Sequence, residues 1–190
     1  MGLVYKISDK ELLDIRNKIF IESGIQSLEK NSFTKSPFST ALFGRNNLGD
    51  YTYELCRVSK GSQLEILVTH ISKGDNWIKI YLNIFKLFPE IQSIEQLNGV
   101  DGLQYHLLPN SLTKMRLRVD DIKGIPLFNY HFMFGGHKLK SFKTERGLKK
   151  GMKELSSLIK EDLTNIDSFV KRWYEIHQVN VTDWKGNKRK

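Results

Sequence analysis

The chain has 190 residues, 39% of them hydrophobic and 11% aromatic, which is enough for one globular domain with a sizeable core. The single cysteine, Cys56, excludes an internal disulfide framework, and no apolar run approaches the length that spans a bilayer. A formal net charge of +9 favours a polyanionic partner, with nucleic acid as the first candidate. We therefore predict a soluble, cytoplasmic protein that does not enter a membrane.

The N-terminal segment predicts an amphipathic helix that begins after Ser8 and ends at Gly24. Ser8 and Glu11 have the spacing of a capping box, and glycine commonly ends a helix. The apolar stripe of this helix comprises Leu12, Ile15, Ile19 and Phe20. Residues 25–50 are less regular, and "STALFGRN" (39–46) predicts one short strand within them.

Three runs then predict a β-meander: "YTYELCRVS" (51–59), "QLEILVTHIS" (63–72) and "NWIKIYLNIFKL" (76–87). Short turns that contain glycine separate the three runs. The third run alternates between an aliphatic face with Ile78, Ile80, Leu82 and Ile84 and a mixed face with Trp77, Lys79, Tyr81, Asn83 and Phe85. We expect the aliphatic face in the core and the mixed face half covered.

Residues 90–110 predict a long connection with one helical turn near its start. "KMRLRV" (114–119) alternates as a strand with Met115, Leu117 and Val119 inward and Lys114, Arg116 and Arg118 outward. "LFNYHFMF" (127–134) predicts a further strand, and Gly135 and Gly136 supply the positive backbone angles of a tight turn or bulge.

The C-terminal part predicts two amphipathic helices over residues 144–163 and 165–178, with Asn165 as a cap between them. The fold class is therefore α+β, an antiparallel sheet of five to seven strands with an N-terminal helix and two C-terminal helices packed on one face. Residues 1–182 form a single globular domain, and residues 183–190 form a basic tail that we expect to fray.

The strongest local charge lies between Lys138 and Lys153, where seven cations face the single acid Glu145, a balance of 7 − 1 = +6. The seven are Lys138, Lys140, Lys143, Arg146, Lys149, Lys150 and Lys153. Cations near the N-terminus of a helix interact unfavourably with the helix dipole, so their presence here suggests a role in binding. Free backbone amides at a helix N-terminus and nearby cations can together bind phosphate. We predict a phosphate-binding surface here. The alternative is a solvated lysine-rich face that only keeps the protein soluble.

A second candidate surface combines aromatic and basic residues on the outward sides of two predicted strands. Its members are Trp77, Lys79, Tyr81, Arg116 and Arg118. Such a surface could stack nucleic-acid bases or anchor a protein partner. The structural alternative is that a helix or loop covers it.

Sequence motifs for metal binding or catalysis are absent. His131 and His137 flank the double glycine, but a hairpin turn explains them better than a metal site, and we predict no metal or other cofactor. The first hypothesis is a non-enzymatic protein whose basic face binds an acidic partner. The alternatives are a protein–protein module that neutralises or inhibits an acidic protein, and a metal-dependent nuclease-like enzyme that uses Asp120, Asp121 and Lys123.

Overall fold

The computed structural model describes residues 5–121 and 136–189. Its sheet has seven strands: β1 (Thr34–Lys35), β2 (Phe43–Arg45), β3 (Tyr51–Ser59), β4 (Gln63–Ile71), β5 (Lys79–Leu87), β6 (Met115–Arg116) and β7 (Asn180–Thr182). The main order is β1-β3-β4-β5-β6, while β2 also pairs with β3 and β7 with β5. Neighbouring strands are antiparallel, except that β7 runs parallel to β5. The predicted meander and the α+β class are confirmed.

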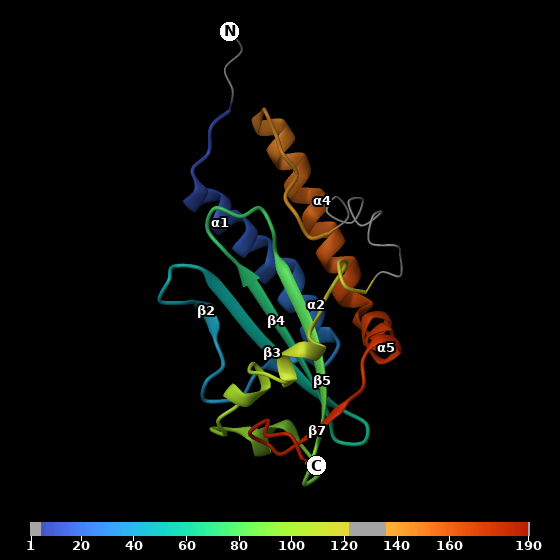
Figure 1. The fold of residues 1–190 in the computed structure, drawn as a ribbon. Helices are drawn as coiled ribbons and strands as arrows, with labels where there is room; N and C mark the ends of the chain where they lie inside the picture. Colours follow the sequence, from blue (N-terminus) through green and yellow to red (C-terminus); the bar gives the residue numbers. More distant parts are fainter. Residues whose placement is uncertain (1–4, 122–135, 190) are drawn as a thin grey trace.

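Helices from both ends of the chain cover one face of this sheet (Figure 1). They are α1 (Asp9–Ile19), a π-helical turn (Phe20–Ile25), α2 (Gln26–Lys30), α4 (Glu145–Thr164) and α5 (Ile166–Ile176). The predicted capping box is present, because the Ser8 side chain accepts from the Glu11 amide and the Glu11 carboxylate accepts from the Ser8 amide. The N-terminal helix and the two C-terminal helices are thus confirmed.

The prediction that Gly24 ends the first helix is wrong. The helical path continues through the π turn into α2, and Gly24 lies inside that turn. A Cβ atom at Gly24 would lie 2.6 Å from the ring of Phe20, far inside van der Waals contact. Glycine is needed here because the Phe20 ring packs against its backbone, and the π turn absorbs the irregular packing.

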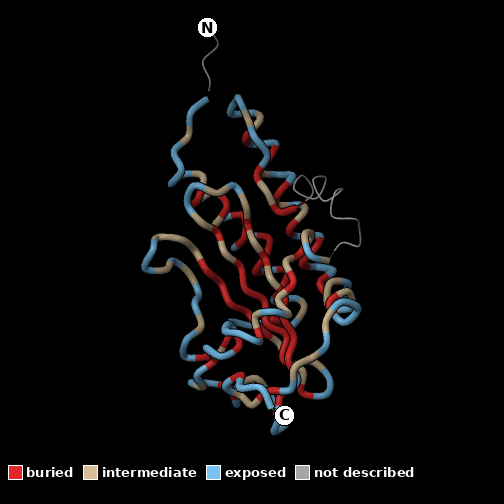
Figure 2. Tube along the Cα trace, viewed as in Figure 1, coloured by how far each residue is buried: buried red, intermediate tan, exposed pale blue. Residues whose placement is uncertain are grey.

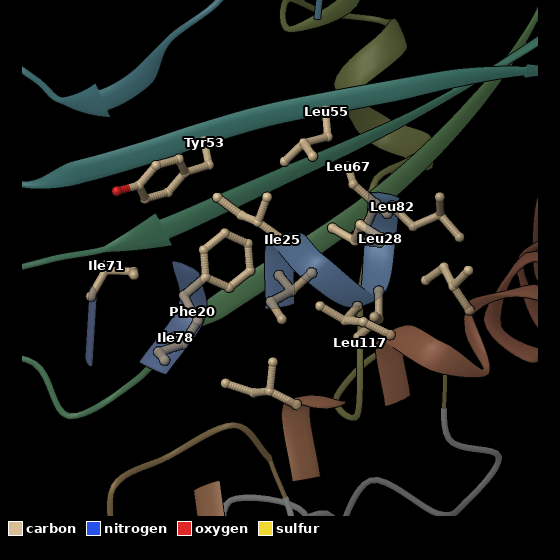
Figure 3. Packing of buried hydrophobic residues seen from close by; sticks show 14 of the residues in the cluster. Phe20, Ile25, Leu28, Tyr53, Leu55, Leu67, Ile71, Ile78, Leu82 and Leu117 are labelled. Atoms are coloured by element: carbon tan, nitrogen blue, oxygen red, sulfur yellow. The ribbon is translucent and has the colours of Figure 1, made fainter. Parts of the chain in front are cut away.

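The main core fills the space between the helices and the aliphatic side of the sheet. Figure 3 shows Phe20, Ile25 and Leu28 from the helices facing Leu55 and Leu82 from the strands. All four aliphatic residues predicted to point inward from β5 are buried in this cluster, namely Ile78, Ile80, Leu82 and Ile84. Burying each such side chain contributes roughly 1.5–3 kcal/mol, which makes this face the main source of stability.

A smaller core covers part of the opposite face. The connection that follows β5 forms three short 3-10 turns, Ile94–Leu97, Leu103–Tyr105 and Asn110–Thr113. It crosses only the lower part of the sheet in the view of Figure 1. The residues buried beneath it include Cys56, Leu64, Ile66, Phe85, Leu97 and Tyr105. The prediction that this face is half covered is therefore confirmed.

The C-terminal residues, which we expected to fray, fold back onto this connection. The Tyr105 hydroxyl donates to the Asp183 carbonyl at 3.0 Å, and the Trp184 indole nitrogen donates to the Pro89 carbonyl at 2.7 Å. The buried amide of Asn110 donates to the Gly186 carbonyl at 2.7 Å. The tail supplies acceptors to Tyr105 and Asn110 and donates from Trp184, so residues 183–187 pack against the folded domain.

The strand predicted over residues 114–119 is shorter than expected. Met115 and Leu117 are buried as predicted, but β6 ends at Arg116 and Arg118 has a left-handed backbone angle, with φ of 59°. The Asp120 carboxylate accepts from the Arg116 amide at 2.7 Å and closes a turn. The predicted strand at 127–134 lies outside the described residues. Figure 2 shows that buried positions concentrate along β3, β4 and β5.

Candidate functional site

The uncovered end of the second sheet face gathers aromatic rings and cations. We call this surface the aromatic-basic face; it comprises Trp77, Lys79, Tyr81, Lys114, Arg116 and Lys138. Tyr81 lies opposite Arg116 in the β5–β6 pairing, and Trp77 forms a bridge with Lys138. Paired residues point to the same side of a sheet, so strand register alone brings most of this surface together.

Three cations lie over two aromatic rings. The Lys114 ammonium is 4.2 Å from the centre of the Tyr81 ring, and the Arg116 guanidinium is 4.6 Å from that of Trp77. Lys138 lies 5.3 Å from the Trp77 ring. Each such contact is worth about 0.5–1 kcal/mol at an exposed site. Within residues 5–121 and 136–189 none of these three cations forms an ion pair with a carboxylate, whereas Lys79 pairs with Asp75.

The turn that carries Trp77 is fixed from the helical side. The buried guanidinium of Arg16 on α1 donates to the carbonyl oxygens of Ser72 and Trp77 at 3.1 and 3.0 Å. The Trp77 ring packs on Gly136, where a Cβ atom would lie 2.5 Å away. We predicted that Gly136 supplies a positive backbone angle. The structure adds a second reason for glycine at this position, the close approach of the tryptophan ring.

A hollow of about 690 Å³ continues from this face toward α4. Its cationic lining residues are Arg118, Lys138, Lys140, Lys150 and Lys153, and its acidic ones are Glu154 and Glu161. Lys138 belongs to both surfaces. The structure thus joins the aromatic-basic face to four of the seven cations that the sequence predicted as a phosphate site. Lys143, Arg146 and Lys149 do not line the hollow.

Carboxylates reduce the free charge of the basic helix. Lys149 pairs with Glu145 at 2.6 Å, and Lys140 pairs with Glu154 at 2.8 Å. Lys150 lies 3.9 Å from the same Glu154. Glu154 follows immediately after the window that gave a balance of +6, so that window overstated the charge available to a partner. One amide of the helix start is also used, since the Thr144 hydroxyl accepts from Gly147.

Arg118, predicted to point outward toward a partner, pairs within the protein. Its guanidinium donates to the Asp162 carboxylate at 2.7 Å, and the buried His137 ring nitrogen lies 2.7 Å from the same carboxylate. Burial raises the pKa of Asp162, but the hydrogen bonds with His137 and Arg118 outweigh it and leave the pKa lowered. His137 therefore has a buried structural partner. His131 lies outside the described residues.

Sequence reasoning missed a polar cluster beside the aromatic-basic face. Glu54 is buried on β3, and its Oε2 lies 2.9 Å from Nε2 of His106. Burial, Lys114 and His106 lower the pKa of His70 on β4 to about 4. Burial also lowers the pKa of Lys114. The sequence signal that could have located Glu54 was the alternation of β3, which places Glu54 on the same face of the sheet as Cys56.

The residues of the predicted nuclease alternative do not form a carboxylate cluster in the described residues. The Asp120 carboxylate closes the turn at Arg116, and burial raises the pKa of Asp121. Lys123 lies outside the described residues. Among residues 5–121 and 136–189, no three His, Cys, Asp or Glu side chains are grouped closely enough to hold a metal ion.

No helix within the described ranges is both long enough and apolar enough to cross a membrane. No protein-family model, curated protein or solved structure matches this chain.

Proposed function

We propose that this protein binds single-stranded nucleic acid through the aromatic-basic face. The observation that carries the proposal is the placement of Lys114, Arg116 and Lys138 over the rings of Tyr81 and Trp77. Single-stranded nucleic acid is bound by surfaces that combine backbone-tracking cations with planar groups on which bases stack. A guanidinium plane held against an aromatic ring also serves as such a platform.

The charge arrangement supports a phosphate-rich partner. Of the four cations of the face, Lys79 pairs with Asp75, whereas Lys114, Arg116 and Lys138 are held by ring contacts and form no ion pair with the described carboxylates. Phosphates would therefore not compete with a described carboxylate for these three cations. The hollow beyond Lys138 adds Lys140, Lys150 and Lys153, together with the acids Glu154 and Glu161. A strand lying across Tyr81 and Trp77 would therefore continue into a hollow in which cations outnumber carboxylates.

The test is fluorescence anisotropy with short single-stranded RNA and DNA and the matching duplexes, titrated from about 50 to 300 mM salt. We expect the wild-type protein to prefer single strands and to lose affinity steeply as salt rises. Arg116→Ala/Lys138→Ala should weaken binding to every sequence and reduce the salt slope by about 2, because two phosphate contacts disappear.

Lys149→Ala is the matched control, since Lys149 also carries a positive charge but is paired with Glu145 and lies away from the hollow. It should leave the salt slope unchanged. The charge reversal Lys149→Glu/Lys150→Glu tests the basic helix separately. Absence of binding at the lowest salt would overturn the proposal. Binding that survives Arg116→Ala/Lys138→Ala but is lost on the helix reversal would move the site to α4.

One observation favours a protein partner as a second candidate function. Four leucines of the connection are exposed, with Leu108 at 73% and Leu112 at 70%, together with Leu103 and Leu107. Clustered exposed apolar side chains mark protein interaction surfaces. Leu108→Asp/Leu112→Asp should abolish capture of an acidic protein partner and leave nucleic-acid binding intact. The opposite pattern would remove this candidate.

A further inference from the structure

A buried carboxylate faces an exposed histidine beside the aromatic-basic face. Glu54 is 4% exposed, and its Oε2 lies 2.9 Å from Nε2 of His106. Its second oxygen, Oε1, is buried with no hydrogen-bond partner in the described part of the chain. His106 is exposed at the end of the turn Leu103–Tyr105, with a third of its side chain open to solvent. A buried acid therefore lies beside Nε2 of a histidine ring that is one-third exposed.

This arrangement assigns the two ring nitrogens of His106 different roles. A carboxylate beside Nε2 stabilises the tautomer that carries its proton on that nitrogen. Nδ1 is then left with a free lone pair, which can accept a proton. A buried carboxylate that orients and supports an imidazole in this way is the arrangement that general-base histidines use.

Lys114 and Tyr81 line the same small cavity as His106. Tyr81, Asn83, His106 and Lys114 line one small cavity of about 10 Å³, with the Lys114 ammonium 4.2 Å from the centre of the Tyr81 ring. The cavity is too small for a phosphate group, so a phosphate would bind at its mouth. Tyr81 and Lys114 also belong to the aromatic-basic face, which makes the two sites continuous.

We propose that this centre cleaves single-stranded RNA bound on the aromatic-basic face, with His106 as the general base, Lys114 as the cation at the phosphate and Glu54 as a positioning residue. The inference rests on the proposed function, because the same face delivers the substrate. It goes further by naming RNA as the substrate class and phosphodiester transesterification as the reaction. The proposed cleavage also differs from the metal-dependent nuclease of the sequence analysis, because a general base and a general acid replace the metal ion in phosphodiester cleavage.

The step balances in atoms and protons. Nδ1 of His106 takes the proton of a ribose 2′-hydroxyl, whose oxygen forms a bond to the adjacent phosphorus. The bond from phosphorus to the 5′ oxygen of the next nucleotide breaks, and that oxygen takes a proton from the Lys114 ammonium. The products are a 2′,3′-cyclic phosphate and a 5′-hydroxyl end. His106 releases its proton to solvent and Lys114 regains one. DNA lacks the 2′-hydroxyl and cannot react.

The experiment measures cleavage of a fluorescent single-stranded RNA with EDTA present, beside DNA of the same sequence. We expect the full-length protein to cleave the RNA to 2′,3′-cyclic phosphate ends and to leave the DNA intact. His106→Gln, purified identically to control for contaminating nucleases, should lower the rate by about 10²–10⁴. Imidazole added to His106→Gly should restore part of the activity, which a purely structural histidine would not allow.

Glu54→Gln tests the positioning role. It should lower the maximal rate while the Kd for 2′-O-methyl RNA, which cannot be cleaved, stays unchanged. The urea midpoint of Glu54→Gln is measured first, because Glu54 is buried and the variant must fold. If it does not fold, the proposal is tested by His106→Gln and by the imidazole rescue of His106→Gly.

The outcomes separate the two proposals. Binding of 2′-O-methyl RNA without cleavage of RNA would overturn this inference and leave the proposed function standing. Failure to bind either RNA would overturn the proposed function itself. Cleavage at an undiminished rate by His106→Gln would also contradict the inference, because the activity would then come from other residues or from a contaminating nuclease.

Discussion

The two faces of the sheet share their strands but differ in what covers them. On one face, α1, α2 and α4 close over aliphatic side chains, and 23 buried hydrophobic residues of the described part of the chain form one cluster. On the other face, a connection without long helices covers ten, and the remaining area carries rings and cations. Leu82 and Tyr81 are neighbours on β5 and belong to opposite faces. Alternate residues of one strand therefore contribute to the core and to the aromatic-basic face.

The difference shows in the electrostatics as well as in the packing. Near the aromatic-basic face, burial lowers the pKa values of both His70 and Lys114, and the nearby Lys114 and His106 lower that of His70 further. On the helical side, the buried cation Arg16 is satisfied by backbone carbonyls and supports the turn beneath Trp77. Arg16 therefore supports the fold, whereas Lys114, Arg116 and Lys138 have no carboxylate partner among the described residues.

The largest expected effect compares two phenylalanines. Phe20 is fully buried on the helix-covered face, so Phe20→Ala should lower the free energy of unfolding by about 3–5 kcal/mol. Phe88 at the end of β5 is 52% exposed and contacts Arg189, so Phe88→Ala should cost less than about 1 kcal/mol. Urea denaturation followed by circular dichroism measures both. Equal losses would contradict the division into a stabilising face and an open one.

The second prediction concerns the buried ion pair between Arg118 and Asp162. Asp162→Asn keeps the shape of the side chain but leaves Arg118 and His137 without their carboxylate. We expect a loss of about 3 kcal/mol in the free energy of unfolding at neutral pH. The exposed pair of Lys149 and Glu145 gives the control, since Glu145→Gln should leave the urea midpoint almost unchanged.

The loss in Asp162→Asn should depend on pH in a defined direction. The pKa of Asp162 is lowered in the folded protein, so its contribution is complete above the ordinary aspartate pKa of about 3.9. That contribution disappears as pH falls through the lowered value. The gap between wild type and Asp162→Asn should therefore be widest near neutrality and narrow below about pH 4. A gap that stays constant on acidification would contradict this assignment.

The periodic parts of the fold could be predicted from the sequence, because their pattern is local. Alternation over residues 76–87 identified both faces and placed Trp77 and Tyr81 on the open one, and alternation over residues 114–119 placed Arg116 outward. The path of the C-terminal residues could not be predicted, because it depends on buried donors such as Asn110 finding distant carbonyl acceptors. The continuation of the first helix past Gly24 also depends on a tertiary contact, the Phe20 ring.

The candidate site could be predicted only in part for the same reason. A count of charge along the chain found the basic helix but could not show that Glu154 neutralises part of it. The approach of Lys138 to Trp77 results from a bridge between two distant segments, where the Ile78 amide donates to the His137 carbonyl at 2.8 Å. The Glu54–His106 pair likewise joins β3 to the long connection. Such contacts have no local signature in sequence.

The smallest expected effect compares two glycines that line the same hollow, Gly136 and Gly151. Gly136→Ala would place a Cβ atom 2.5 Å from the Trp77 ring, so the ring must shift, at a cost of about 1–3 kcal/mol. Gly151 lies inside α4, and its added Cβ would meet Leu139 at 3.4 Å, an ordinary contact. Gly151→Ala should therefore stabilise the protein by about 0.5–1 kcal/mol through helix propensity. Urea midpoints measure both, and the anisotropy assay should show weaker binding for Gly136→Ala alone. If displacement of Trp77 leaves binding unchanged, the aromatic-basic face is not the nucleic-acid surface.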